Sequence, residues 1–300
     1  MQAILPLVYL AAGWLLARSG VDWRSLASRL LSVVVIPTVI VMHVVGTDSR
    51  LALVMVSAVV WMLLMLALGS ASSRDPVEKL CFGYLNIGWL GLPVAAAALD
   101  RSAVGVVTTF YVTSSILGNT LGPAWLRRSA PTAPADRAGS DGSRLARPWR
   151  DAARTPSLRA LVTGLCLRPL GPWLAQHASW LAHGATFLLG MLGMMILGSW
   201  LAHAPLRAAD LWRALPRSAL RAALSVLVLG TIGAAGALGG APAMRITPAV
   251  VVLLSILPPA ANIVVLETAA LRTGRSAPLI AAGTVWSLAA IALYMAYAIL

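Results

Sequence analysis

Two asparagines stand in the middle of long apolar segments, where a side-chain amide must find a hydrogen-bonding partner. Asn86 lies in Leu80–Asp100, LCFGYLNIGWLGLPVAAAALD, and Asn262 lies in Val250–Leu271. A neutral amide can donate to a carboxylate or accept from freed backbone groups, at a lower desolvation cost than a buried arginine. These residues are therefore the first candidates for binding a small anion, and repair of a broken backbone is the alternative.

Residues that interrupt helices lie close to both asparagines. They are Gly88, Gly91 and Pro93 in the first segment and Pro258 and Pro259 in the second. Glycine weakens a helix, and proline removes a backbone donor. Two broken spans in corresponding places of two halves of a chain are the best sequence indication of a transporter binding site. We therefore predict that these five residues shape the site, with a kink that serves packing alone as the alternative.

Half-helices that meet near the middle of a membrane leave unpaired N–H groups and positive dipole ends at their meeting point. No water competes for these groups there, so the expected occupant is an anion. Trp89 stands inside the first break. It is predicted either to form a wall of the substrate site or to pack against lipid or another helix.

Glu267 is a carboxylate well inside an apolar segment, shortly after Asn262. Acids inside a membrane are costly and usually functional, so Glu267 is a candidate for carrying a proton or helping to hold a cation. The alternative is an acid near the cytoplasmic end of its span that reaches water or pairs with a loop arginine. A coupling role predicts that Glu267→Gln changes the pH or sodium dependence of transport.

Other kinds of chemistry find little support in the residues. Cys81 and Cys166 both fall in apolar segments without metal-ligand spacing, and His177 and His183 do not share a helical face. The motifs GxSxG, HExxH and GxxxxGK[ST] are absent from the sequence. We therefore expect no metal, no cofactor, no enzymatic activity and no ATP hydrolysis by this chain.

The composition is that of a polytopic membrane protein. The chain is 59% hydrophobic and 11% charged, with a mean hydropathy of +0.83, so it lacks the polar surface that a soluble domain needs. Its net charge of +13 lies mostly in short loops between apolar runs, where basic residues set topology. Nucleic-acid binding is therefore not expected. The first residues lack the basic region and cleavage site of a signal peptide and are predicted to form the first membrane helix.

About 20 apolar residues are needed for each helical crossing of a bilayer. By this measure the sequence predicts an all-α protein with ten spans, at residues 3–18, 26–45, 51–71, 79–99, 103–123, 157–175, 183–203, 217–239, 247–270 and 277–299. Most of the 23 basic residues face one side if both termini lie outside. This bias predicts a cytoplasmic location for the loops that carry them.

One long hydrophilic stretch, APTAPADRAGSDGS and its surroundings, divides the chain. It is rich in Ala, Pro, Gly, Ser and Arg, and it predicts a loosely ordered cytoplasmic linker at 127–156. The linker separates a first five-helix repeat at 1–126 from a second at 157–300. Because five crossings per half force opposite insertion, the plan is that of a 5+5 inverted repeat with crossed, broken fourth and ninth spans.

Several motifs resemble those of the auxin efflux carrier (AEC) family. The chain resembles a bacterial member of this family. NIGWLGLP at Asn86–Pro93 resembles the fourth-span signature of this family, and LPPAANIVVLE at Leu257–Glu267 resembles that of the ninth. The opening ILPLVYLAAGWLLARSG and the later LASRLLSVVVIPTVIV, which contains Pro37, are similar to its first two spans. The resemblance covers nearly the whole chain except the linker.

The resemblance implies a helical transporter whose fourth and ninth spans cross as an X. Spans one, two, six and seven would form a scaffold, and spans three to five and eight to ten would form a mobile transport unit. It also implies a possible homodimer in a plasma membrane, which for a bacterial member is the inner membrane. The expected function is secondary transport, efflux or uptake, of a small organic anion such as a carboxylate or an auxin-like acid by elevator-type alternating access.

Other functions stay open on the residues alone. A sodium- or proton-coupled symporter or exchanger of similar inverted-repeat build would favour two carboxylates near the crossing, and the fourth span has none. A channel or receptor is compatible with broken spans. An intramembrane enzyme would need a nucleophile with a base, which the sequence does not offer.

Overall fold

The computed structural model describes residues 5–18, 23–46, 49–128, 155–203, 207–238 and 246–299. Nearly all of them are helical. Six helices in this part of the chain are long and apolar enough to cross a membrane: Arg24–Val45, Ala52–Ser72, Arg101–Pro123, Ser179–Ala202, Ala208–Leu238 and Ser276–Ala296. The protein is therefore helical and membrane-embedded, as the composition predicts.

The apolar runs of the sequence fold into the following elements. The first half contains α1 (Leu5–Leu16), α2 (Arg24–Leu30), η2 (Leu31–Val35), α3 (Ile36–Val45), α4 (Ser49–Ser72), α5 (Pro76–Gly83), η3 (Ile87–Gly91), α6 (Leu92–Ala98) and α7 (Arg101–Arg128). The second half contains α9 (Pro156–Leu167), η4 (Arg168–Leu170), α10 (Gly171–His177), α11 (Ser179–His203), α12 (Ala208–Leu238), α13 (Pro248–Ile256), α14 (Ile263–Leu271) and α15 (Ser276–Ile299). Most of the predicted linker, at 129–154, lies outside the described residues.

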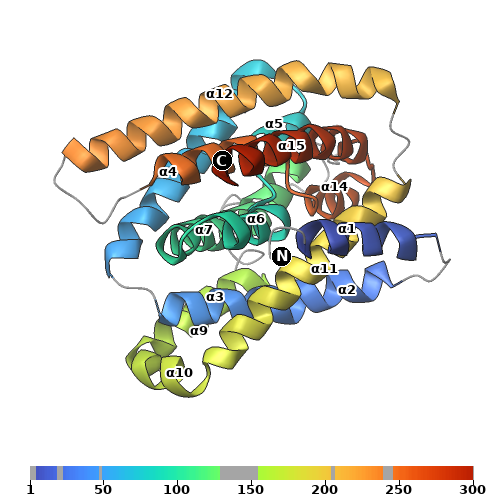
Figure 1. The fold of residues 1–300 in the computed structure, drawn as a ribbon. Coiled ribbons are helices and arrows are strands. Elements are labelled where there is room, and N and C mark those ends of the chain that lie inside the picture. Colours follow the sequence, from blue (N-terminus) through green and yellow to red (C-terminus); the bar gives the residue numbers. More distant parts are fainter. Residues whose placement is uncertain are drawn as a thin grey trace, which may run out of the picture.

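Two groups of helices lie on either side of a central layer. In Figure 1, α12 runs along the upper edge and α9 and α10 form the lower edge, with α6 and α7 between them. In the upper group α12 packs on α13 and α15, and α4 packs on α5 and α7. In the lower group α1 packs on α11 and α3 packs on α9. The broken segments occupy the centre, where the two groups meet.

Two prolines are preceded by a wide helical turn. The π-helical turns η2 and η3 end two residues before Pro37 and Pro93, respectively. In η3, the Gly91 N–H donates to the Asn86 carbonyl five residues earlier, at 3.1 Å. A proline ring clashes with the carbonyl four residues before it, and a widened turn relieves this clash. The prolines thus place irregular turns in the middle of the protein.

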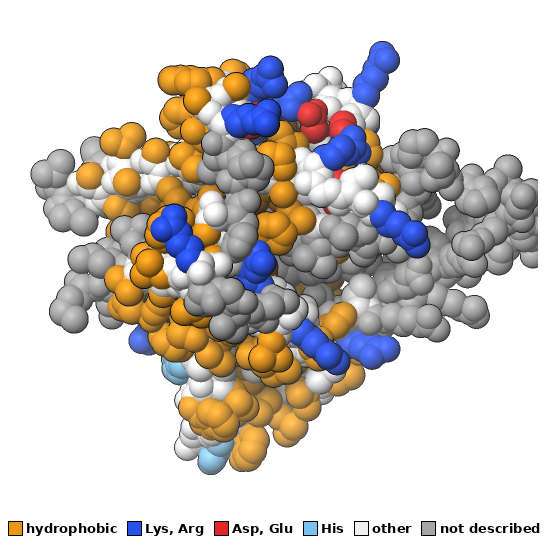
Figure 2. Space-filling view, turned by 90° about the vertical axis from the view of Figure 1, so that its right-hand side faces the viewer, with side chains coloured by type: hydrophobic (Ala, Val, Ile, Leu, Met, Phe, Trp, Pro, Cys, Tyr) orange, Lys and Arg blue, Asp and Glu red, His pale blue; other side chains and the backbone are white. Residues whose placement is uncertain are grey.

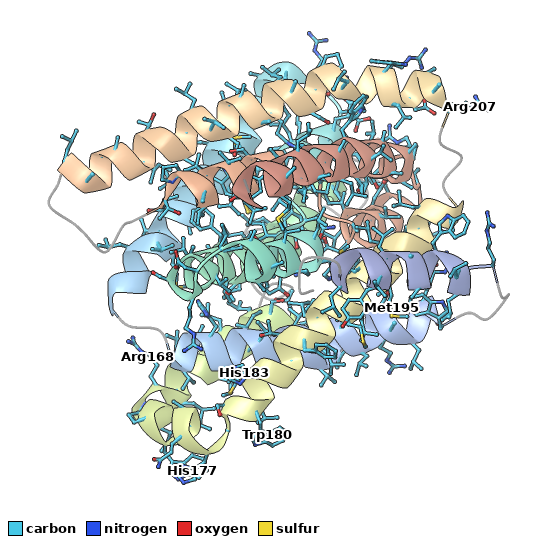
Figure 3. The ribbon with its side chains drawn as sticks, in the orientation of Figure 1. Arg168, His177, Trp180, His183, Met195 and Arg207 are labelled. Atoms are coloured by element: carbon cyan, nitrogen blue, oxygen red, sulfur yellow. The ribbon has the colours of Figure 1, made fainter. Side chains whose placement is uncertain are left out.

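The closest packing joins the first apolar helix to α11. A Cβ at Gly13 would overlap the backbone of Met195, and a Cβ at Gly198 would overlap the backbone of Leu10. Figure 3 labels Met195 on α11, alongside α1. Because glycine alone permits this approach, helix α1 is fixed against α11 by backbone contact.

Gly198→Val is expected to lower the thermal midpoint of the purified protein. The added side chain must push the two backbones apart, and overpacking of this kind typically costs about 1 to 3 kcal/mol. Gly184→Val is the matched control on the same helix, because a Cβ at Gly184 meets no atom within 4 Å. Equal midpoints for the two variants in a detergent melting experiment would contradict the α1–α11 contact.

Ion pairs connect charged side chains at one end of the molecule. Figure 2 shows basic side chains at several places across this face, acidic side chains among them in its upper part, and hydrophobic side chains between them. Arg217 on α12 binds Glu78 at 2.6 Å, and Arg275 before α15 binds Asp75 at 2.9 Å. Burial raises the pKa of Glu78, but hydrogen bonds from Ser73 and Arg217 outweigh it and hold this pKa below its ordinary value. The network ties the start of α5 to α12 and α15.

Candidate functional site

Two helices are interrupted, and their breaks lie against each other. The first break separates α5 from η3, and the second separates α13 from α14. Leu85 and Pro259 form an antiparallel bridge between the two extended stretches. The Asn86 N–H donates to the Pro258 carbonyl at 2.8 Å, and the Ala260 N–H donates to the Tyr84 carbonyl at 2.9 Å. We call this paired region the crossing. Each break satisfies part of the other's backbone.

Several backbone N–H groups at the crossing donate to no described acceptor. Among the described residues, the N–H groups of Gly88, Ala261 and Asn262 donate to no acceptor. Gly88 lies in the first turn of η3, and Ala261 and Asn262 lie just before α14. These are the N-terminal ends of the second half-helices, where free N–H groups and the helix dipole favour negative charge.

Asn86 combines the two roles that the sequence left open. Its Oδ1 accepts from the Trp89 N–H at 3.3 Å and so caps η3. Its side chain is 3% exposed, and its Nδ2 has no partner within the described part of the chain. A buried amide hydrogen without an acceptor costs free energy until an acceptor arrives. Asn86 therefore offers a donor to a ligand while its oxygen holds the helix start.

Asn262 lies in a side-chain network. Its Nδ2 donates to the Tyr84 hydroxyl oxygen at 2.9 Å and to Asn119 Oδ1 at 3.1 Å. Asn119 in turn donates to Ser157 Oγ at 3.5 Å. Because both amide hydrogens of Asn262 are engaged, its side chain orients Tyr84 and Asn119, and the backbone N–H of Asn262 is the group left for a ligand.

A cavity of about 410 Å³ opens beside the crossing. Its walls come from α2, the two π-helical turns, α3, α7, the two breaks and α14. The lining residues are Ser28, Arg29, Leu31, Ser32, Ile36, Tyr84, Leu85, Asn86, Gly88, Trp89, Tyr111, Ser114, Ser115, Asn119, Ala260, Ala261, Asn262 and Leu266. None of these is a carboxylate, and Arg29 is the charged residue among them. The cavity therefore combines free N–H groups, hydroxyls and a cation with aromatic and aliphatic walls.

The predicted site residues divide into two sets. Asn86, Gly88, Trp89 and Asn262 line the cavity, whereas Gly91, Pro93, Pro258 and Pro259 do not. A Cβ at Gly91 would overlap Leu257, and Pro93 packs beside Gly190. The second set thus shapes the break and its packing.

Trp89 has a second contact besides the cavity. A Cβ at Gly193 of α11 would overlap the Trp89 side chain, so this glycine gives the indole its space. Trp89 therefore both walls the cavity and packs on a helix, which are the two roles that the sequence proposed as alternatives.

Glu267 does not line the cavity. Its side chain is fully buried, and Oε1 accepts from the Arg275 N–H at 2.8 Å and from the Thr273 hydroxyl. Oε2 accepts from the Ser276 N–H at 2.8 Å. These bonds fold the loop after α14 back on the carboxylate and cap the start of α15. Arg275 Nε also lies 3.9 Å from Oε1, in keeping with the alternative of a loop arginine. A local structural role accounts for these contacts, and the substitution described next separates it from the coupling role proposed from the sequence.

Glu267→Gln is expected to lower stability and to leave the pH and sodium dependence of uptake unchanged. The amide NH₂ would face backbone donors, and a hydrogen bond to a charged group contributes about 1.5 to 3 kcal/mol. Glu78→Gln is the matched control, since its partly exposed ion pair contributes only about 0 to 1 kcal/mol. Melting temperature and uptake against pH check both; an altered pH or sodium profile for Glu267→Gln alone would assign it to coupling.

Several residues of the site carried no clear sequence pattern. Tyr84, Tyr111 and Asn119 come together only because the chain folds, and Arg29 looked like one of the basic residues that set topology. Asn119 is a polar residue within an apolar span, which is a signal of the same kind as Asn86. In the described ranges, no group of three or more His, Cys, Asp or Glu side chains is placed to hold a metal ion. Figure 3 places His177 and His183 toward the lower end of the molecule.

No protein-family model matches this chain, and no curated protein matches it either. The chemistry of the site therefore rests on its own residues.

Proposed function

We propose that this protein is a secondary carrier of a small organic anion that binds in the cavity at the crossing. The observation that carries the proposal is the set of unused donors there. The Gly88, Ala261 and Asn262 N–H groups and Asn86 Nδ2 gather at a cavity whose lining holds Arg29 and no carboxylate. Such a site satisfies its donors when a carboxylate enters.

The cavity also suits the body of an organic acid. A volume of about 410 Å³ lies in the usual range of small-molecule sites, about 300 to 1,000 Å³. Trp89, Tyr111 and the aliphatic side chains can cover an apolar or aromatic body, while the free donors hold the charged group. A mono- or dicarboxylate or an auxin-like acid has this chemistry.

Alternating access would follow the plan that the AEC resemblance implies. The ten spans are then α1, α2–α3, α4, α5–α6, α7, α9–α10, α11, α12, α13–α14 and α15, in a 5+5 inverted repeat. The scaffold consists of α1, α2–α3, α9–α10 and α11, and the other helices form the transport unit. The packing of α1 on α11 and of α3 on α9 supports this division. In this plan, the cavity lined by α2 and by the crossing would lie between the scaffold and the transport unit.

The proposed location is the bacterial inner membrane, with both termini outside and the linker cytoplasmic. The bias of basic residues in the sequence supports this orientation. The charged side chains in the upper part of Figure 2 and the position of Arg207 in Figure 3 are in keeping with it.

A cation-coupled symporter or exchanger has less support than an anion carrier. Its ion would need acidic ligands at the crossing, and the cavity lining has none. A channel would conduct without saturation, and a receptor would bind without moving its ligand, so transport kinetics separate these functions from a carrier.

The test is an uptake screen in proteoliposomes with labelled mono- and dicarboxylates and indole acids. A carrier gives saturable uptake that unlabelled substrate competes away. Conductive flux that does not saturate would assign a channel, and binding without uptake would assign a receptor. Protein-free liposomes and the Asn86→Asp variant described below serve as controls.

A further inference from the structure

The carbonyl end of α13 lacks its normal donors. Pro258 and Pro259 have no N–H, so the carbonyls of Leu254 and Ser255 cannot receive the usual helical hydrogen bonds. The next N–H, that of Ala260, is taken by the other break. This end of the helix therefore concentrates partial negative charge inside the protein.

A buried arginine meets this negative end. Arg221 lies on α12, is 4% exposed, and donates from Nη2 to the Leu257 carbonyl at 2.5 Å. It forms no ion pair with a described residue, and its Nε has no hydrogen-bond partner there. An unpaired guanidinium in a dry interior is expensive. Its hydrogen bond to the Leu257 carbonyl, at the negative end of α13, compensates part of this cost.

The Arg221 guanidinium also lies near the carboxyl end of α5, the half-helix that precedes the first break. A small cavity of about 60 Å³ is lined by Arg221, by Cys81 and Phe82 from the last turn of α5, and by Pro259. This cavity shares no lining residue with the anion cavity. The carbonyl end of α13 thus binds a cation of the protein, and the carbonyl end of α5 lines the same small cavity as that cation. The two N–H ends face the anion cavity.

In carriers with broken helices, unwound carbonyls and half-helix carboxyl ends are the groups that coordinate a coupling cation. We propose that Arg221 is a built-in counter-cation, whose guanidinium occupies the carbonyl end of the crossing in place of a bound sodium or potassium ion. The consequence for transport rests on the proposed carrier function. Its consequence for stability does not, because the guanidinium holds the break at Leu257 whether or not a substrate moves.

Arg221 is a positioning residue in this account. By binding the Leu257 carbonyl it fixes the start of the second break, and the break carries the free N–H groups of Ala261 and Asn262. Loss of the charge would therefore affect the anion site through the backbone, without a direct contact to the ligand.

The test compares Arg221→Ala and Arg221→Lys with Arg217→Ala, which removes an arginine one turn earlier on the same helix. Arg217 is 56% exposed and pairs with Glu78, so it controls for loss of a positive charge on α12. Purified proteins are melted in detergent in sodium, potassium or N-methyl-D-glucamine chloride at equal ionic strength, with and without millimolar guanidinium. Uptake is measured in the same salts.

Wild type is expected to melt and transport alike in all three salts. Arg221→Ala should melt lower and lose about tenfold or more in uptake, Arg221→Lys should keep most of both, and guanidinium should restore Arg221→Ala alone. The proposal fails if wild type requires sodium or potassium, if Arg221→Ala behaves as wild type, or if guanidinium acts equally on all variants. If Arg221→Ala cannot be purified, the melting and uptake of wild type and Arg221→Lys in the three salts test the proposal. A requirement of wild type for sodium or potassium would contradict it. If no substrate is found, the melting data still decide.

Discussion

Asn86→Asp is expected to abolish anion uptake while the protein keeps its fold. Aspartate retains the oxygen that accepts from the Trp89 N–H, and it is as good a helix N-cap as asparagine. It replaces the unpartnered Nδ2 donor with negative charge. Two like charges about 4 Å apart interact by about 4 kcal/mol at an effective dielectric constant of about 20, so uptake should fall about 100- to 1,000-fold.

This substitution separates the two roles of Asn86, because backbone repair needs only the oxygen and anion binding needs the amide. Uptake by proteoliposomes and the melting temperature are measured on the same preparation. Thr247→Asp is the matched control, since Thr247 caps α13 by accepting from Val250 N–H at the other end of that helix, outside the cavity. Wild-type uptake by Asn86→Asp would show that its amide does not face the substrate.

Asn262→Ala is expected to lower uptake at least about tenfold and to lower stability as well. It removes the donor to the Tyr84 oxygen and to Asn119 Oδ1, and a buried polar group left without its partner costs about 1 to 3 kcal/mol. Both freed side chains line the cavity, so the wall that faces the substrate loses its fixed geometry.

Ser225→Ala provides the comparison for this loss. It removes the acceptor of the Trp61 Nε1–H, a buried 3.0 Å hydrogen bond between α4 and α12 that does not line the cavity. The two variants should melt at similarly reduced temperatures, whereas only Asn262→Ala should raise the KM for uptake. Equal KM values in both variants would remove the Asn262 network from substrate binding.

The positions of the breaks could be predicted because helix-breaking chemistry is local. Proline lacks an N–H wherever it stands, so Pro258 and Pro259 indicated the second interruption before any tertiary contact was known. The first break lies several residues before Pro93, and the helix accommodates that proline with a π-helical turn. The long apolar helices were predictable for the same reason, since hydropathy over about 20 residues depends on the segment alone. The sequence also pointed to Asn86, because a neutral amide in an apolar segment needs an account of its partners.

The contacts across the protein could not be predicted in this way. The Leu85–Pro259 bridge joins residues from two distant segments, and no local pattern specifies their pairing. Arg221 falls within the predicted eighth span, 217–239, and nothing in the sequence distinguished it from the basic residues that set topology. The helix begins at Ala208, and its turns carry Arg221 inward to the Leu257 carbonyl.

Glu267 illustrates a different limit. Hydropathy placed it inside a span, and burial agrees, yet the loop after α14 returns to supply its donors. A chain reversal of this kind depends on the main-chain geometry at Arg272, which has a φ of 55°. Few side chains other than glycine favour a positive φ, so an arginine at this position does not predict the chain reversal.

The main-chain pairing at the crossing bears on how such a carrier could move. Its two hydrogen bonds join only peptide groups, so side-chain replacement at Leu85 leaves the joint itself intact. Separating the two breaks would leave these peptide groups without hydrogen-bond partners in a dry interior, at a high free-energy cost. A transport movement that opens the crossing is therefore unfavourable. In the proposed carrier, the binding site would therefore keep its shape and move with the ligand as one rigid body relative to the scaffold helices.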